Sequence, residues 1–289
     1  MVSAYIWGVC WSLLSGVQWF YGSPCDREHV GFVTNSNEFQ FFWSEGPLNW
    51  ISQLGLRSFT RFSDITVHVY SYDRGLNPDI QGCICLDANE YLPREIYERV
   101  KTSFGGKYGE GSGYSRAADL FRYKLLYEKG GWYFDTDCLL IKPLTPLFDR
   151  DHVFGWASAT VVGNAVLKFP KGDAMLDELY KGCVQKSPAE VSVPGTVSLF
   201  TQYLKKFNLI DRALPRDYFY AMNGLWSKQE QRSFVLHESP YILHLYASTP
   251  PSTFELRRQI DALNKSLSLR IARKIPFGKQ IRKFLVKGE

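Results

Sequence analysis

Strand-like and helix-like segments alternate along residues 38–250, and this alternation constrains the fold more than any other feature of the sequence. Apolar runs of strand length predict β-strands at 38–44, 65–71, 82–86, 132–134, 153–157, 161–169 and 241–246. Apolar residues at helical spacing predict helices from 47 to about 62 and at 92–100, 114–129, 173–185 and 195–207. Strands that alternate with helices usually pair in parallel, so we expect an α/β fold, a sandwich with a mostly parallel central sheet flanked by helices.

A glycine-rich stretch, FGGKYGEGSG, lies at residues 104–113. It lacks the order G-x-x-x-x-G-K-[ST] of a phosphate-binding loop, and no apolar strand precedes it. These features exclude the phosphate-loop interpretation. The sequence instead predicts a mobile loop beside a functional site.

Residues 130–144, GGWYFDTDCLLIKPL, form an apolar run that is interrupted once, by Asp135-Thr136-Asp137. In an extended segment residues i and i+2 point to the same side, so Asp135 and Asp137 should project together beyond the C-terminal end of a strand. Ligands of open α/β sheets bind at that edge. Two carboxylates with no neighbouring cationic side chain repel each other unless a hard, oxygen-seeking cation lies between them. The segment therefore predicts Mg²⁺ or Mn²⁺ bound together with a diphosphate.

A second Asp-x-Asp pair shows that this spacing by itself decides little. Asp149 and Asp151 lie in a polar stretch that follows two prolines, which is typical of a solvated loop. The first pair differs because a helix, a Gly-Gly break and an apolar strand precede it.

The helix before the Gly-Gly break carries charged residues at Arg116, Asp119 and Arg122, spaced so that they lie along one side. Asp119 sits among apolar residues, where an unpaired carboxylate would be costly. Two interpretations remain open. Asp119 forms an internal salt bridge with one of the arginines, or it binds sugar hydroxyls while an arginine binds the sugar or the diphosphate.

The segment YSRAADLFRYKLLYEKGGWYFDTDCLLIKPL closely resembles the donor-site segment of glycosyltransferase family 32, whose pattern is S-D-x-x-R-Y-x-x-L-Y-x-x-G-G-x-Y-x-D-x-D. That family includes initiating mannosyltransferases of fungi and bacterial capsule and lipopolysaccharide enzymes, and the glucosyltransferase domains of the large clostridial toxins are related to it. FFWSEGPL, VYSYD and NAVLKFPKGDAMLDELY are similar to further blocks of the family, so the resemblance covers roughly residues 38–250.

This resemblance implies a GT-A fold and a metal-dependent, retaining glycosyltransferase, a hexosyltransferase that moves a sugar from a nucleotide-sugar, more often UDP- than GDP-linked, to a glycan or lipid-linked acceptor. The metal would be Mn²⁺ (or Mg²⁺), held by Asp137 with help from Asp135. Trp43 and Tyr72 would lie near the nucleotide base.

The resemblance also implies that Asp119 and Arg122 position the donor sugar, because related enzymes have no settled protein nucleophile. The family's C-terminal His-x-Trp-x-x-Ser-Trp motif has only a degraded counterpart in residues 244–249, HLYAST. His244 is therefore either a metal ligand or a core histidine of the last strand.

Two other functions remain as alternatives. The run FDTDCLL imitates the D-x-D opening of haloacid-dehalogenase-like phosphatases, and GDAMLD at 172–177 imitates their later G-D-x-x-x-D motif. The Gly-Thr that usually follows the second aspartate of the opening motif is replaced here by Cys138-Leu139. A non-catalytic sugar-binding homologue is the second alternative, against which the intact Asp119, Arg122, Asp135 and Asp137 argue.

The two ends of the chain differ from the middle. Residues 1–22 contain no charged side chain and include three tryptophans, which predicts an apolar segment packed on the protein, lying at a membrane interface or spanning a membrane. Residues 255–289 carry ten Lys/Arg and three Asp/Glu, a net charge of +7, interleaved with Leu and Ile. This basic amphipathic tail is typical of attachment to anionic lipid and does not favour a nucleic-acid partner.

We therefore expect an apolar segment and loop at 1–37, a catalytic domain at 38–250 and a basic tail at 251–289. We expect a membrane-associated enzyme of cell-surface polysaccharide synthesis at the cytoplasmic face of a bacterial inner membrane. A Golgi-type anchor through residues 1–22 is the alternative. The six cysteines, at 10, 25, 83, 85, 138 and 183, show no metal-ligand spacing and are expected to be free thiols.

Overall fold

A computed structural model describes residues 38–108, 110–185, 195–221 and 240–245. The chain divides into two units, residues 1–35 and 36–289, and every described residue lies in the second. The apolar segment 1–22 and the basic tail 251–289 lie outside the described residues. None of the helices in the described ranges combines the length and apolar character needed to cross a membrane.

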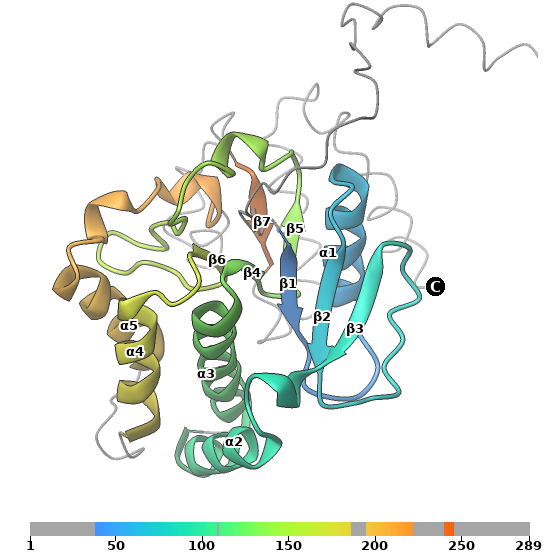
Figure 1. Cartoon of the computed structure of the whole chain (residues 1–289), viewed down its shortest axis with the longest axis horizontal. Coiled ribbons are helices and arrows are strands. Elements are labelled where there is room, and N and C mark those ends of the chain that lie inside the picture. Colours follow the sequence, from blue (N-terminus) through green and yellow to red (C-terminus); the bar gives the residue numbers. More distant parts are fainter. Residues whose placement is uncertain (1–37, 109, 186–194, 222–239, 246–289) are drawn as a thin grey trace, which may run out of the picture. The chain divides into compact units, whose positions relative to one another are not determined.

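Among the described residues, the central sheet has five strands in the order β3-β2-β1-β4-β6 (Figure 1). The strands are β1 (Phe39–Phe42), β2 (Val67–Ser71), β3 (Cys83–Asp87), β4 (Gly131–Phe134) and β6 (Val166–Phe169). The pairs β1–β2, β1–β4 and β2–β3 are parallel, while β6 runs antiparallel to β4. A separate two-stranded antiparallel sheet joins β5 (Cys138–Leu140) to β7 (Ile242–His244). The expected mostly parallel α/β sheet is confirmed.

In the part of the chain that the structure describes, five α-helices connect or flank these strands: α1 (Trp50–Phe62), α2 (Arg94–Tyr108), α3 (Glu110–Lys129), α4 (Ala174–Gln185) and α5 (Gly195–Lys206). Short 3-10 helices lie at Ala88–Glu90 (η1), Thr145–Leu147 (η2), Ile210–Arg212 (η3) and Arg216–Tyr218 (η4). The predicted strand at 153–157 is wrong, because this segment makes only isolated bridges, and the strand expected at 161–169 is shorter, beginning at Val166.

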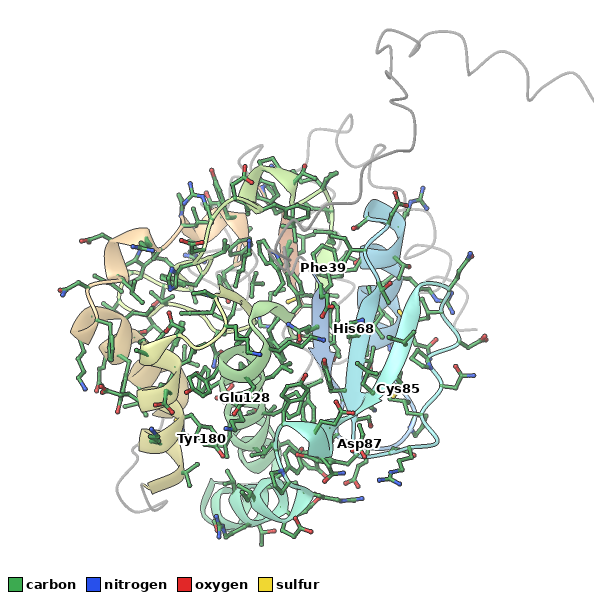
Figure 2. All side chains as sticks on the ribbon, in the orientation of Figure 1. Phe39, His68, Cys85, Asp87, Glu128 and Tyr180 are labelled. Carbon is green, nitrogen blue, oxygen red and sulfur yellow. The ribbon has the colours of Figure 1, made fainter. Side chains whose placement is uncertain are left out.

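Alternating side chains of the central strands build two cores, one on each face of the sheet. Phe39 and Phe41 of β1 pack with α1, whereas Phe42 packs with α2 and α3. The same alternation places Trp132 and Phe134 of β4 on the α1 face and Tyr133 on the α3 face. Figure 2 shows Phe39 and His68, on neighbouring strands, within this densely packed region. Asp135 lies two positions after Tyr133, so it too is directed toward α3.

The glycine-rich stretch 104–113 is not a mobile loop, which corrects the sequence prediction. Its described residues belong to α2 and α3. A Cβ built on Gly113 would lie 2.2 Å from the carbonyl oxygen of Lys101 and 2.9 Å from the backbone nitrogen of Gly105. The absence of side chains lets the two helices approach this closely, so the glycines serve helix packing.

The break between α3 and β4 is the one that the sequence predicts. Gly130 and Gly131 have φ angles of +75° and +86°, which glycine adopts without steric cost. The buried side chain of Gln40 on β1 donates hydrogen bonds from Nε2 to the carbonyl oxygens of Gly130 (2.8 Å) and Trp132 (3.1 Å). This clamp fixes where β4 begins and, through it, where the aspartates after β4 lie.

Candidate functional site

The segment Asp135–Cys138 forms a tight turn between β4 and β5. The backbone N–H of Cys138 donates to the carbonyl oxygen of Asp135 at 3.0 Å, and the N–H of Asp135 donates to the carbonyl oxygen of Ala165 at 2.9 Å. The extended geometry that the sequence predicted for this segment is therefore wrong. The turn gives the two aspartates different partners, one on α3 and one on β7.

Arg122 of α3 holds the first aspartate of the turn. Its Nη2 lies 2.9 Å from Asp135 Oδ1 and 3.1 Å from Asp119 Oδ1, so one guanidinium bridges two carboxylates. The guanidinium also lies over the ring of Tyr133, whose hydroxyl donates to Asp135 Oδ1 at 3.2 Å. Arg122 is 3% exposed and Asp119 5%. The internal salt bridge that the sequence left open is present, and it is part of a larger network.

Asn164 joins this network and was not identified from the sequence. Its Nδ2 donates to Asp119 Oδ1 and to the hydroxyl of Tyr123, both at 2.9 Å, and its backbone carbonyl oxygen accepts from Arg122 Nη1. A buried amide in the apolar run VVGNAVLKF was the one signal that could have pointed to it. Arg122 and Asn164 both contact Asp119, so the orientation of its carboxylate is fixed by its partners.

Burial and charge shift the protonation of this group. Burial raises the pKa of Asp135 to about 6, against the opposing effect of Arg122 and with a further upward effect of Asp137. Burial would lower the pKa of Arg122, but Asp135, Tyr133 and Asp119 outweigh it and raise this pKa well above its ordinary value. The arginine is thus firmly cationic, and Asp135 takes up a proton at a higher pH than an ordinary aspartate does.

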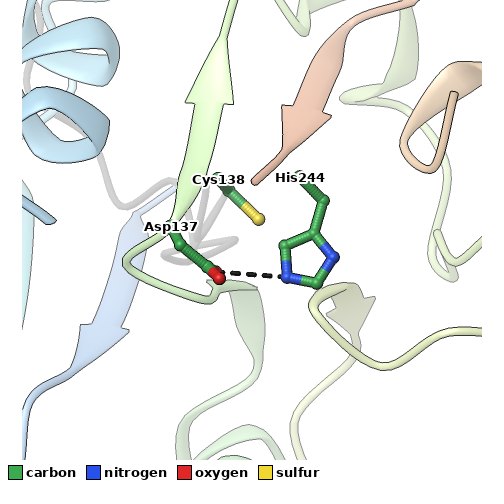
Figure 3. A group of neighbouring side chains, drawn as sticks. All are labelled: Asp137, Cys138 and His244. Atoms are coloured by element: carbon green, nitrogen blue, oxygen red, sulfur yellow. Dashed lines mark ion pairs between the residues drawn. The ribbon is translucent and has the colours of Figure 1, made fainter. Parts of the chain in front are cut away.

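Asp137 lies beside residues of the two-stranded sheet β5–β7. Its Oδ1 is 3.1 Å from His244 Nε2, and Asp137, Cys138 and His244 each offer a ligand atom within 4.8 Å of the others (Figure 3). Burial lowers the pKa of His244, but Asp137 and Asp135 outweigh this and raise it. This donor set of oxygen, nitrogen and sulfur fits a divalent metal. Asp135 is not in the set, because Arg122 holds it.

The predicted base-binding residues lie at the carboxyl ends of β1 and β2. Trp43 follows β1, and its Nε1 donates to the carbonyl oxygen of Gly46 at 2.9 Å. Tyr72 follows β2 and is 6% exposed, with its hydroxyl donating to the carbonyl oxygen of Leu92 at 2.9 Å. Tyr72 lines a hollow of about 690 Å³ together with Glu45, Gly46, Asp73, Arg74, Gly75 and Arg94. β1 lies between β2 and β4, so the hollow and the turn both lie at the carboxyl ends of these neighbouring strands.

Asp173 of GDAMLD, the later of the two segments that imitate a phosphatase, has a structural role. Asp173 caps α4, with Oδ1 accepting from the N–H groups of Met175 (3.0 Å) and Leu176 (3.2 Å), and its Oδ2 lies 2.8 Å from His152 Nε2. The second Asp-x-Asp pair, Asp149 and Asp151, is exposed, as the sequence predicts.

Comparison with known proteins gives a family match to part of the chain. Residues 86–154 match the family described as "Glycosyltransferase sugar-binding region containing DXD motif". This range begins in β3 and contains α2, α3, β4 and the turn, whereas Asn164 and His244 lie beyond it. No curated protein matches the sequence at a significant level.

Similar solved structures include two glycosyltransferases. The structure titled "PaToxG Glycosyltransferase" is 14% identical, with a TM-score of 0.43, and the match covers 85% of each chain. The apo form of the glycosyltransferase GlyE of Streptococcus pneumoniae TIGR4 is also 14% identical, with a TM-score of 0.46. That match covers 87% of this chain and 64% of GlyE. The matched residues 86–154 contain the Asp119–Arg122–Asp135 network and the turn, so this part of the chain is similar to the sugar-binding region of DXD-containing glycosyltransferases.

Proposed function

We propose that the chain is a metal-dependent, retaining glycosyltransferase of the family 32 kind, which transfers a hexose from a UDP-linked donor to a glycan or lipid-linked acceptor. The observation that carries this proposal is the buried guanidinium of Arg122, which bridges Asp119 on its own helix and Asp135 of the DXD turn. An arginine in a purely structural ion pair needs only one carboxylate partner. Two carboxylates on one buried arginine, beside a third at Asp137, create a site with excess negative charge that a divalent cation would balance.

Asp137 and His244 are the residues that would hold this metal, which we propose to be Mn²⁺ or Mg²⁺ in the working enzyme. The bound ion would stabilise negative charge on the leaving nucleoside diphosphate. The hollow beside Tyr72, with Arg74 and Arg94 on its walls, would accept the nucleotide. It lies at the carboxyl ends of parallel strands, where nucleotides bind in open α/β sheets.

The residues of the Arg122 network would position the sugar. Asp119 and Asp135 accept from the same guanidinium, and Asn164 restrains Asp119 from a second side. A carboxylate with this many donors is a weak nucleophile, so we assign Asp119 the role of binding sugar hydroxyls and Arg122 the role of fixing it. Such preorganised groups contribute to rate by orienting the reacting sugar.

Thermal shift of the full chain tests this function. We expect UDP or a UDP-sugar to raise the melting temperature of the wild type in the presence of Mn²⁺, with a smaller effect of GDP-sugars. Asp137→Ala should lose the Mn²⁺-dependent part. Asp151→Ala is a matched control, because it removes the second aspartate of the exposed Asp-x-Asp pair and should respond as the wild type does.

The proposal fails if no nucleotide stabilises the wild type, or if Asp137→Ala and the wild type respond equally. Hydrolysis of a nucleotide-sugar that depends on Mn²⁺ would exclude a non-catalytic homologue. Release of inorganic phosphate from a phosphoester, without turnover of any nucleotide-sugar, would favour the haloacid-dehalogenase-like alternative.

We further propose that the enzyme acts in cell-surface polysaccharide synthesis at the cytoplasmic face of a bacterial inner membrane, to which the basic tail attaches it. The net charge of +7 in residues 255–289, interleaved with Leu and Ile, supports this. Vesicles with anionic lipid should sediment the full chain but not a variant that ends at residue 254. Equal sedimentation of both would show that the tail is not needed for lipid binding and would favour residues 1–22, the alternative anchor.

A further inference from the structure

The metal site proposed above contains a thiol as well as a carboxylate and an imidazole. Cys138 follows Asp137 directly, and in the β5–β7 sheet it is the register partner of His244. Paired residues of antiparallel strands carry their side chains on the same face of the sheet. Figure 3 shows the sulfur of Cys138 on the side of His244 that faces Asp137. The N–H of Leu245 donates to the carbonyl oxygen of Asp137 at 3.0 Å, which extends the pairing of the strands to the turn.

All three side chains are buried and held in place. Cys138 is fully buried, while Asp137 and His244 are each 9% exposed. The ring of Tyr220 packs edge-on against the imidazole of His244, with centroids 5.8 Å apart. The hydroxyl of Tyr220 in turn accepts from the N–H groups of Ala165 (3.1 Å) and Val166 (3.3 Å). The imidazole is thus restrained on a second side, which favours a preformed set of ligand atoms.

The ligand atoms of Asp137, Cys138 and His244 are oxygen, sulfur and nitrogen, and these elements affect which metal ion the site prefers. Ligands at 2.0–2.3 Å from one zinc ion lie roughly 3–4 Å apart, so three atoms within 4.8 Å of one another need only small movements to share an ion. Three protein ligands with one open position are the arrangement of catalytic zinc sites. Mg²⁺ and Mn²⁺ favour oxygen donors, whereas a thiolate favours Zn²⁺ and Co²⁺.

We propose that Cys138 is the third protein ligand of the site and raises its affinity for thiophilic divalent ions, Zn²⁺ above all, relative to its affinity for Mn²⁺. The proposal rests on the assignment of Asp137 and His244 as metal ligands in the proposed function. When the ion binds, the sulfur–metal bond replaces the S–H bond of Cys138, and a proton on the ligating ring nitrogen of His244 is released as well; both protons pass to solvent. No change of oxidation state is involved. Either metal would leave a position open for the diphosphate.

Cobalt spectroscopy of the full chain, without nucleotide, tests the ligand directly. Co²⁺ bound to a thiolate shows a sulfur-to-cobalt charge-transfer band in the near ultraviolet. We expect the wild type to develop this band with one equivalent of Co²⁺ and Cys138→Ser to lack it. Cys183→Ser removes a half-buried cysteine on α4 and is the matched control. It should keep the band.

Affinities for Zn²⁺ and Mn²⁺ give a second readout that separates this inference from the proposed function. Cys138→Ser and Cys138→Ala should each lower the affinity for Zn²⁺ by at least about tenfold, about the effect of losing 1.4 kcal/mol of binding free energy, and leave Mn²⁺ affinity nearly unchanged. Asp137→Ala should lower both affinities. Melting temperatures of the variants without metal show that they are folded.

Two results would overturn the inference. One is a charge-transfer band that persists in Cys138→Ser. The other is an unchanged ratio of Zn²⁺ to Mn²⁺ affinity in both cysteine variants. If Mn²⁺ still binds through Asp137 in that case, the thiol assignment is wrong while the proposed function stands. If Asp137→Ala binds both metals as the wild type does, the metal site of the proposed function is itself wrong.

Discussion

Gly55 on helix α1 lies directly against the carbonyl oxygen of Thr136, the middle residue of the DXD turn. A Cβ built on Gly55 would lie 2.3 Å from this oxygen and 2.9 Å from the carbonyl oxygen of Cys138. One turn further along α1, the hydroxyl of Ser58 accepts from the N–H of Leu140 at 2.8 Å. α1 and α3 pack on opposite faces of the central sheet, so the turn is supported by α1 on one side and held by Arg122 on the other.

Gly55→Ala should displace the turn, because backbone oxygens cannot rotate away as a side chain can. We expect a loss of about 1–3 kcal/mol in the free energy of unfolding from overpacking, which exceeds the gain of up to about 1 kcal/mol in helix propensity. Mn²⁺ affinity should fall by about tenfold or more. Urea unfolding and metal titration of the same preparation measure both effects.

Gly182→Ala on α4 is the matched control for that substitution. The nearest atom to a Cβ at Gly182 is the hydroxyl oxygen of Tyr203, at 2.6 Å, the far end of a half-buried side chain that can move. This variant should bind Mn²⁺ as the wild type does. Unchanged stability and metal affinity in Gly55→Ala would show that the turn tolerates displacement and would contradict the supporting role of α1.

The hydroxyl of Ser52 on α1 donates to the hydroxyl of Thr136 at 3.1 Å, a contact to the side chain between the two aspartates. Ser52→Ala and Thr136→Val should each weaken Mn²⁺ binding, and the double variant should be no weaker than the worse single one. A double-mutant cycle on metal affinity is the measurement, with an expected coupling of about 0.5–1.5 kcal/mol. Gln53→Ala, which removes a hydrogen bond from Nε2 to the carbonyl oxygen of Leu48 at 2.9 Å, is the control on the same helix. Strict additivity would show that the contact does not position the turn.

Arg122→Met should destabilise the fold strongly, because the buried Asp119 and the partly buried Asp135 would then lie close together without their cation. Removal of one partner from a buried ion pair typically costs about 3–5 kcal/mol. Arg122→Lys keeps a charge but loses the planar fork that reaches both carboxylates, so it should be more stable than Arg122→Met yet turn over at least about 100-fold more slowly than the wild type. Denaturant unfolding measures the stability of the two variants, and the rate of donor hydrolysis measures their turnover. Wild-type stability in Arg122→Met would show that the network contributes nothing to folding.

The sequence predicted the parts of this fold that depend on local pattern. The strands β1 to β4, all five helices and the Gly-Gly break follow from the spacing of apolar residues and from the two glycines at 130–131. Of the second sheet, the sequence predicted only the last strand, β7. The other strand, β5, has three residues and forms only by pairing with β7, which is far along the chain. The turn at Asp135–Cys138 depends on a hydrogen bond that spacing cannot show.

The candidate site was predictable where its residues are close in sequence. Asp119, Arg122, Asp135 and Asp137 come from one helix–strand unit, and the resemblance to a known family identified them together. Asn164 joins them only through the pairing of β6 with β4, and this pairing is antiparallel at the edge of an otherwise parallel sheet. The helical glycine-rich stretch was missed for a related reason, since the close approach of α2 and α3 favours glycine in a helix where propensity alone disfavours it.

His68 on β2 lies in a charged cluster on the α3 face of the sheet, away from the proposed metal site. Its Nδ1 is 3.3 Å from Lys129 Nζ and 3.4 Å from the carboxylate of Glu38, and Lys129 also donates to the hydroxyl of Tyr70 at 3.0 Å. Burial, and then the ammonium of Lys129, lower the pKa of His68 below its ordinary value of 6.5, although Glu38 acts in the opposite direction. The folded protein therefore resists protonation of His68.

The sign of the pH effect follows from linkage. Below about pH 6.5 the histidine of the unfolded chain binds a proton that the folded chain does not yet accept, so stability falls as the pH falls through this range. His68→Gln should lose less free energy of unfolding between pH 7.5 and pH 5.5 than the wild type does. Lys129→Met removes one cause of the lowered pKa and should show an intermediate dependence. Parallel loss of stability in the wild type and His68→Gln, measured by urea unfolding, would show that His68 titrates alike in both states and would contradict the restraint that this cluster places on it.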